Sequence, residues 1–109
     1  MSSSKNNAGV HCEIYVGSSE IHGKGVFAGE SIKKNTSVGF LEGVPTKRNG
    51  MHVLWIDDSE GWRVTNKFRF LNHSSSPNLE IDVAGEKPQA IALRTIKRDE
   101  ELTFDYGWE

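Results

Sequence analysis

The sequence predicts a mostly β domain with little helix. Apolar residues alternate with polar ones over residues 79–83 and again over 102–106, which is the pattern of a half-buried strand. Eleven glycines in 109 residues allow frequent turns. No stretch has the apolar period of a long amphipathic helix, and no internal repeat is evident. About eight short strands are therefore expected.

The first half of the chain is expected to form strands separated by glycine turns. Apolar and β-branched residues mark each strand, and glycine with polar neighbours ends it. Gly43 to Gly50 is expected to be a loop, because it contains Pro45 and the turn pair Asn49-Gly50. The strands expected here cover residues 13–16, 26–28, 37–41 and 51–56.

The second half adds one helical turn and more strands. Asn66 is placed to cap a helical turn that ends at Leu71. Residues 84–88 are expected to close a hairpin, since they contain glycine and proline between two apolar segments. The strands expected here cover residues 62–65, which pair with 51–56, and residues 79–83, 89–96 and 102–106.

Length and cysteine content favour one small intracellular domain. A chain of this size supports a single core, expected over residues 11–109, and the small polar residues 1–10 are expected to be a flexible tail. No apolar run has the length of a membrane span, so no membrane partner is expected. The single cysteine, Cys12, excludes an intrachain disulfide and a cysteine-rich zinc site. It also fits a cytoplasmic or nuclear location.

Charge gives no sign of nucleic-acid binding. The formal net charge is -2, and the basic pairs Lys33-Lys34, Lys47-Arg48 and Lys97-Arg98 are scattered along the chain. Direct contact with nucleic acid is therefore not expected. The histidines and the cysteine lack any spacing typical of metal ligands, so no metal site is expected either.

The least ordinary segment is Arg69-Phe-Leu-Asn-His-Ser-Ser-Ser-Pro-Asn78. After Leu71 the segment has neither the alternation of a strand nor the apolar period of a helix. Its Asn, His and Ser side chains can hydrogen-bond nearby backbone groups in place of regular structure. We expect a rigid polar loop that is set into the core.

This segment and two others resemble the three signature blocks of SET-domain protein lysine methyltransferases, in the order of that family. The other two are His22-Gly-Lys-Gly-Val-Phe-Ala28 and Glu101-Leu-Thr-Phe-Asp-Tyr106. The resemblance implies a SET-like β-clip fold, in which several small sheets surround a pseudoknot. It also implies an enzyme that transfers a methyl group from S-adenosylmethionine to the side-chain amine of a lysine. The implied substrate is a protein or peptide with a basic, lysine-containing segment.

The resemblance places cofactor contacts in all three blocks. Gly23 and Gly25 lack Cβ atoms, so the backbone can approach a ligand closely. Asn72 and His73 would contact the cofactor, although His73 is equally well explained as a structural hydrogen-bonder. Trp108 either closes a pocket or is a frayed terminal aromatic. The cofactor-binding candidates are His22, Gly23, Lys24, Gly25, Asn72, His73, Tyr106 and Trp108.

Tyr106 is the catalytic candidate. Methyl transfer to an amine is an in-line displacement that needs positioning, and a phenol oxygen can orient the amine. The amine must be neutral, whereas the ordinary pKa of lysine is about 10.4. A sulfonium about 4 Å away costs the ammonium about 4 kcal/mol at an effective dielectric near 20. That moves the pKa of the amine towards neutrality, so no dedicated base is required.

Two departures from the family leave alternatives open. The chain stops shortly after Tyr106, without the cysteine-rich cap that often follows this block, and no tyrosine occurs between the first two blocks. A homodimer is one way to complete the groove, with Trp55 and Trp62 either in the core or on a dimer face. The alternative function is a non-catalytic SET-like module that binds a peptide or a partner. A serine hydrolase is disfavoured because no G-x-S-x-G motif is present.

Overall fold

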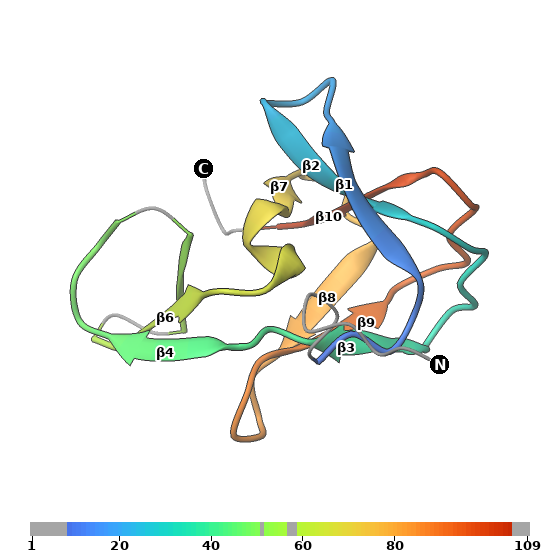
Figure 1. Cartoon of the computed structure of the whole chain (residues 1–109). Coiled ribbons are helices and arrows are strands. Elements are labelled where there is room, and N and C mark those ends of the chain that lie inside the picture. Colours follow the sequence, from blue (N-terminus) through green and yellow to red (C-terminus); the bar gives the residue numbers. More distant parts are fainter. Residues whose placement is uncertain (1–8, 51, 57–58, 106–109) are drawn as a thin grey trace, which may run out of the picture.

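The computed structural model describes residues 9–50, 52–56 and 59–105, and these form three small sheets (Figure 1). The sheets have the strand orders β1-β2-β10-β7, β3-β9-β8 and β4-β6-β5. The one helix described is a short 3-10 turn, so the predicted mostly β fold is confirmed. The elements are β1 Ile14–Ser18, β2 Lys24–Ala28, β3 Ser37–Phe40, β4 Gly43–Thr46, β5 Val53–Trp55, β6 Gly61–Val64, η2 Lys67–Phe70, β7 Asn72–His73, β8 Leu79–Asp82, β9 Gln89–Ala92 and β10 Glu101–Phe104.

Strand β10 lies in the middle of the first sheet. It pairs antiparallel with β2 on one side and parallel with β7 on the other. Leu102, Thr103 and Phe104 are all buried, although the alternating pattern predicted a strand with one exposed face. That prediction was wrong because β10 has packed neighbours on both faces.

Two local predictions were confirmed and one was wrong. The Asn66 side chain accepts a hydrogen bond from the Phe68 N–H (3.3 Å) and caps η2, as expected. Strands β5 and β6 pair as expected. Residues 43–46, predicted as part of a loop, instead form β4 and pair with β6. Pro45 is tolerated because β4 is an edge strand and needs no N–H on its outer side.

A short structural repeat, which the sequence did not reveal, joins the two halves of the fold. The connections from β2 to β3 and from β9 to β10 meet at Ile32 and Ile96, which exchange both backbone hydrogen bonds (2.8 Å each). Three residues later, Asn35 and Asp99 adopt left-handed φ angles of 71° and 69°. Both isoleucines are buried, so the repeat forms part of the core.

The N-terminal segment is paired at least from Gly9 onwards. Val10, placed by the sequence in a tail, forms a bridge with Gly39, and the carbonyl of Gly9 accepts a hydrogen bond from the N–H of Phe40 (2.8 Å). No helix among the described residues is long and apolar enough to cross a membrane.

Candidate functional site

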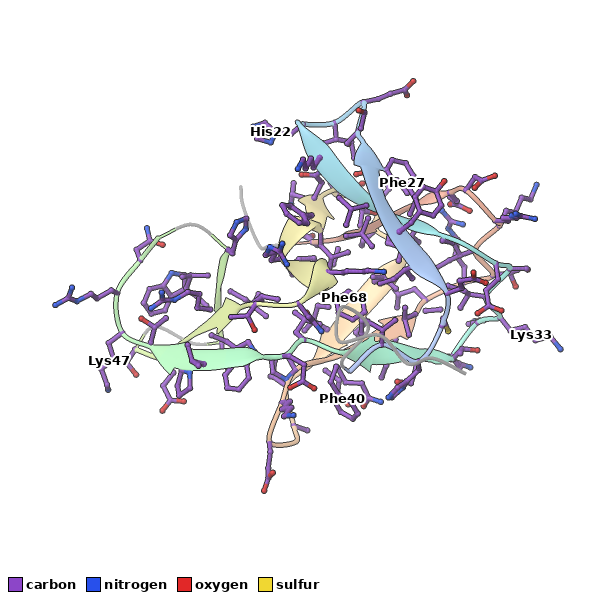
Figure 2. The ribbon with its side chains drawn as sticks, viewed as in Figure 1. His22, Phe27, Lys33, Phe40, Lys47 and Phe68 are labelled. Atoms are coloured by element: carbon purple, nitrogen blue, oxygen red, sulfur yellow. The ribbon has the colours of Figure 1, made fainter. Side chains whose placement is uncertain are left out.

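The β1–β2 hairpin ends in a loop whose shape is set by Ser19. The Ser19 N–H donates to the Gly23 carbonyl (2.8 Å), and the Ser19 hydroxyl accepts from the Ile21 N–H (2.9 Å). Gly23 has a φ of +44°, which favours glycine, and a Cβ there would meet no atom within 4 Å. His22 and Lys24 are both exposed, and Figure 2 shows His22 at the tip of this hairpin. The backbone at Gly23 is therefore open to solvent but fixed in shape.

Asn72 ties this loop to the middle of the first sheet. Its amide Nδ2 lies 3.1 Å from the Ser19 Oγ, 3.2 Å from the His22 carbonyl oxygen, 3.0 Å from the Lys24 carbonyl oxygen and 2.9 Å from a Glu101 carboxylate oxygen. Its two N–H donors are shared among these four oxygens, so the orientation of the amide is determined. None of these four contacts uses the amide oxygen, and no hydrogen bond to it is found among the residues that the structure describes.

Glu101 is the centre of the network and was missed as a site residue. Its carboxylate accepts from the Ser19 hydroxyl (2.8 Å to each oxygen) and from Asn72. A Cβ at Gly25 would lie 2.3 Å from the nearer carboxylate oxygen. Gly25 is buried, so the space beside it holds this carboxylate. No local pattern reveals these contacts, because Ser19 and Glu101 are 82 residues apart.

Asn78 holds the polar segment against β10 through two hydrogen bonds of its side chain. Its Nδ2 donates to the Glu101 carbonyl (2.8 Å), and its Oδ1 accepts from the Thr103 N–H (2.8 Å). The side chain is thus bonded to β10 as a neighbouring strand would be. The polar segment and the last block therefore lie side by side, and the pseudoknot that the resemblance implies stays a prediction.

Replacing Asn78 by alanine is expected to destabilise the fold by about 2–3 kcal/mol. The change leaves the buried N–H of Thr103 without its partner, which costs about 1–3 kcal/mol, and it removes a donor from the partly buried C=O of Glu101, which costs less. Chemical denaturation of both proteins measures the loss. The exposed Ser76→Ala serves as the control, and an Asn78→Ala protein as stable as the parent would contradict this role.

His73 joins β10 through its backbone and its side chain. It pairs with Phe104 in the parallel ladder, so the predicted loop contains a short strand at its start. Its Nδ1 lies 3.7 Å from a carboxylate oxygen of Asp105. This arrangement supports the structural interpretation of His73, and its contact with a cofactor stays a prediction. Tyr106 and Trp108 lie outside the described residues.

Two grooves flank the end of β10 and the β4-β6-β5 sheet. The first has a volume of about 420 Å³ and runs between β5 and β8. Most of its lining is apolar and includes Phe104, and its carboxylates are those of Glu80 and Asp105. The second, of about 380 Å³, lies between the β4-β6-β5 sheet and the turn after β8. Trp55 lines the first groove and is 38% exposed, so the core interpretation was wrong for it. Trp62 packs partly against the core and donates its Nε1–H to the Leu41 carbonyl (2.7 Å).

The surroundings of two titratable groups, Glu100 and Cys12, shift their pKa values. A hydrogen bond from Arg94 (2.5 Å) holds the pKa of Glu100 below its usual value, so this carboxylate is ionised at neutral pH. Burial, and then the charge of Glu30, raise the pKa of the Cys12 thiol, which stays protonated. Within the described part of the chain, no three His, Cys, Asp or Glu residues form a metal-binding group.

Comparisons with known proteins agree on one family. The family model of the SET domain matches residues 23–107. Over 86% of this chain, the sequence is 31% identical to the histone-lysine N-methyltransferase MEDEA of Arabidopsis thaliana. Over 81% of this chain, it is 36% identical to human histone-lysine N-methyltransferase 2B. It spans only 16% and 4% of those two relatives.

Solved structures give the same result. KRYPTONITE in complex with mCHG DNA and SAH superposes with a TM-score of 0.77 at 26% identity, covering 92% of this chain and 24% of that one. A candidate histone methyltransferase of Plasmodium falciparum superposes with a TM-score of 0.70 at 25% identity, and here the match covers 92% of this chain and 97% of the other.

Proposed function

The chain belongs to the SET-domain family, and we propose that it transfers a methyl group from S-adenosylmethionine to the side-chain amine of a lysine in a protein or peptide. The observation that carries this proposal is the hydrogen-bond network of Ser19, Asn72 and Glu101. Since Asn72 also bonds the carbonyls of His22 and Lys24, the network brings the three signature segments together at one point. We further propose that residues 11–109 act as a single SET-like unit.

The exposed loop at Gly23 fits the methionine end of the cofactor. The space that a Cβ at Gly23 would occupy is open, so a ligand can approach the backbone of His22 to Lys24. The amide oxygen of Asn72 is an acceptor suited to the ligand's ammonium group, because the amide nitrogen is committed to the loop. The KRYPTONITE structure contains SAH, which supports the same ligand class here.

The charge of Glu101 favours a cationic ligand. Its carboxylate is held by Ser19 and Asn72 and is partly buried, so its negative potential is screened less than that of a surface group. S-adenosylmethionine, when bound, supplies a methyl group on a positively charged sulfur. We propose that Glu101 favours binding of this positively charged cofactor. Lys24, His73 and Trp108 provide further contacts to the cofactor in this proposal.

The first groove is our proposed site for the lysine-bearing segment. It reaches Phe104 and Asp105, the two residues before Tyr106, and its other walls are β5 and β8. The carboxylates of Glu80 and Asp105 favour a basic segment, and the apolar lining suits the methylene chain of a lysine. In this proposal the Tyr106 hydroxyl orients the amine. The histone-lysine methyltransferases among the relatives make a histone-like tail in the nucleus the leading substrate class.

Isothermal calorimetry with S-adenosylmethionine tests the proposal. We expect saturable heat that corresponds to one ligand per chain, and the same result in the presence of a basic lysine peptide. If S-adenosylmethionine does not bind in either condition, the proposed methyl transfer is contradicted and the non-catalytic module is favoured. Light scattering of the same samples tests the alternative in which a second copy of the chain completes the groove.

A further inference from the structure

Two of the three basic pairs, which are distant in the sequence, lie close together in the fold. The pair Lys33-Lys34 directly follows Ile32, and the pair Lys97-Arg98 directly follows Ile96. The two isoleucines are bonded to each other, so the connections that carry the basic pairs meet. Figure 1 shows these connections, from β2 to β3 and from β9 to β10, on the side of the molecule opposite to β4. The net charge of the chain gives no sign of this gathering of basic residues.

Backbone hydrogen bonds hold both basic pairs in turns of the same shape. The Lys33 carbonyl accepts from the Thr36 N–H (3.1 Å), and the Lys97 carbonyl accepts from the Glu100 N–H (3.0 Å). Each of these turns contains one residue with a left-handed φ, as described above for the repeat. The four basic side chains therefore start from backbone positions that are fixed relative to one another.

None of the four basic side chains is used inside the described part of the protein. All four are exposed, and none forms a hydrogen bond or an ion pair with another described residue. Because the isoleucines pair antiparallel, Lys33 lies opposite Thr95 and Lys97 lies opposite Ser31. Both hydroxyl residues are exposed as well. The outer side of the bridge thus presents ammonium and hydroxyl groups together.

The carboxylates of the same segments are bonded to the protein. Residues 30–36 and 94–100 contain five basic and three acidic residues, so these segments carry an excess of positive charge. All three carboxylates accept hydrogen bonds: Glu30 from the Glu13 N–H (2.8 Å), Asp99 from the Tyr15 hydroxyl (2.8 Å) and Glu100 from the Arg94 guanidinium (2.5 Å). These bonds direct the carboxylates towards the protein, whereas the four unpaired cations can extend into solvent.

We propose that this basic surface, formed by Lys33, Lys34, Lys97 and Arg98, binds the phosphate backbone of duplex DNA. The inference rests on the proposed function, because a histone-like tail belongs to a protein core that DNA wraps. Lysine, arginine and hydroxyl side chains are the groups that contact phosphates without reading sequence. A lipid surface fits less well, since binding there also requires exposed apolar side chains, and the exposed residues of 31–35 and 95–99 are all polar.

Fluorescence anisotropy with a labelled duplex of about 20 base pairs tests this inference without any methyl transfer. Affinity is measured between about 50 and about 200 mM salt. Neutralising four phosphates releases their counterions, so we expect the logarithm of the affinity to fall with the logarithm of the salt concentration with a slope of about -3 to -4. Two duplexes of unrelated sequence should bind equally well, because the phosphates carry no sequence information.

Neutral variants of the three basic pairs locate the contact. Lys33→Gln/Lys34→Gln and Lys97→Gln/Arg98→Gln should each weaken binding at least about tenfold at low salt and make the slope shallower by about 2. The control is Lys47→Gln/Arg48→Gln, which removes the same charge. Figure 2 shows Lys47 and Lys33 at opposite ends of the molecule, so the control should keep the parental affinity and slope.

Three results would overturn the inference. They are the absence of duplex binding at low salt, an affinity that does not depend on salt, and an equal loss of affinity in the control variant. Vesicles that contain phosphatidylserine serve as a second probe. Vesicle binding that is lost in the Lys33 and Lys97 variants, without any binding to the duplex, would assign the surface to a membrane instead of DNA.

Methyl transfer to a free peptide separates this inference from the proposed function. The Lys33 and Lys97 variants should methylate a free peptide at the parental rate, because the basic surface lies outside the proposed catalytic site. Transfer to the peptide by a protein that does not bind the duplex would contradict only the DNA surface. Duplex binding that depends on both basic pairs, together with no transfer to any peptide, would support the DNA surface and contradict the proposed methyl transfer.

Discussion

Replacing Tyr106 by phenylalanine is expected to lower the rate of methyl transfer about a hundredfold or more while the fold persists. The proposed role of the hydroxyl is to orient the amine for in-line attack, and a misplacement of about 1 Å can cost about a hundredfold. The rate is measured as methylated peptide formed at saturating cofactor. Because the ring remains, unfolding by heat should change little.

Tyr15→Phe is the matched control for this change. It also removes one phenol oxygen, which hydrogen-bonds Asp99 (2.8 Å) at the turn before β10. This contact lies outside the proposed site, so the Tyr15→Phe protein should keep its rate. If Tyr106→Phe also kept the parental rate, Tyr106 would have no role in the transfer step.

Replacing Asn72 by aspartate is expected to weaken cofactor binding about thirtyfold or more. The shape of the side chain is kept, but its N–H donors become a carboxylate oxygen that faces Glu101 and two carbonyl oxygens. Lost hydrogen bonds and like-charge repulsion together cost about 2 kcal/mol or more, which corresponds to about thirtyfold in affinity. Asn72→Ala should weaken binding less, because it removes the donors without adding a charge.

Calorimetric titration with S-adenosylmethionine measures both Asn72 variants. The control is Asn49→Asp, which makes the same charge change in an exposed loop. It keeps an oxygen acceptor for the Trp55 Nε1–H (3.2 Å), so cofactor binding should be unaffected. If the Asn72→Asp protein binds S-adenosylmethionine with the parental affinity, cofactor binding by the Gly23 loop does not depend on the hydrogen bonds of Asn72.

The sequence predicted those parts of the fold that follow from local chemistry. The cap at Asn66 is a single side chain that bonds a nearby N–H, so residue type and position were sufficient. The hairpin of β8 and β9 follows from alternation and a glycine–proline turn. Strand β4 was missed because Pro45 normally opposes a strand, and the sequence does not say which strand lies at a sheet edge.

Long-range pairing could not be predicted from the sequence. Strand β7 is only two residues long and exists because β10 lies parallel beside it. The repeat at Ile32 and Ile96 is visible only through their mutual hydrogen bonds, since the similarity around them is a few residues long. In the site, the motifs indicated Asn72 and the glycine loop. The role of Glu101 in joining them emerged only from the folded chain, because its partners are distant in sequence.

Mass spectrometry of a basic lysine peptide, incubated with the protein and S-adenosylmethionine, tests the central claim most directly. We predict that the lysine gains the mass of one or more methyl groups, and that Tyr106→Phe protein gives little or no product. A parent protein that binds both the cofactor and the peptide, yet leaves the mass of every lysine in a panel of basic peptides unchanged, would contradict the claim.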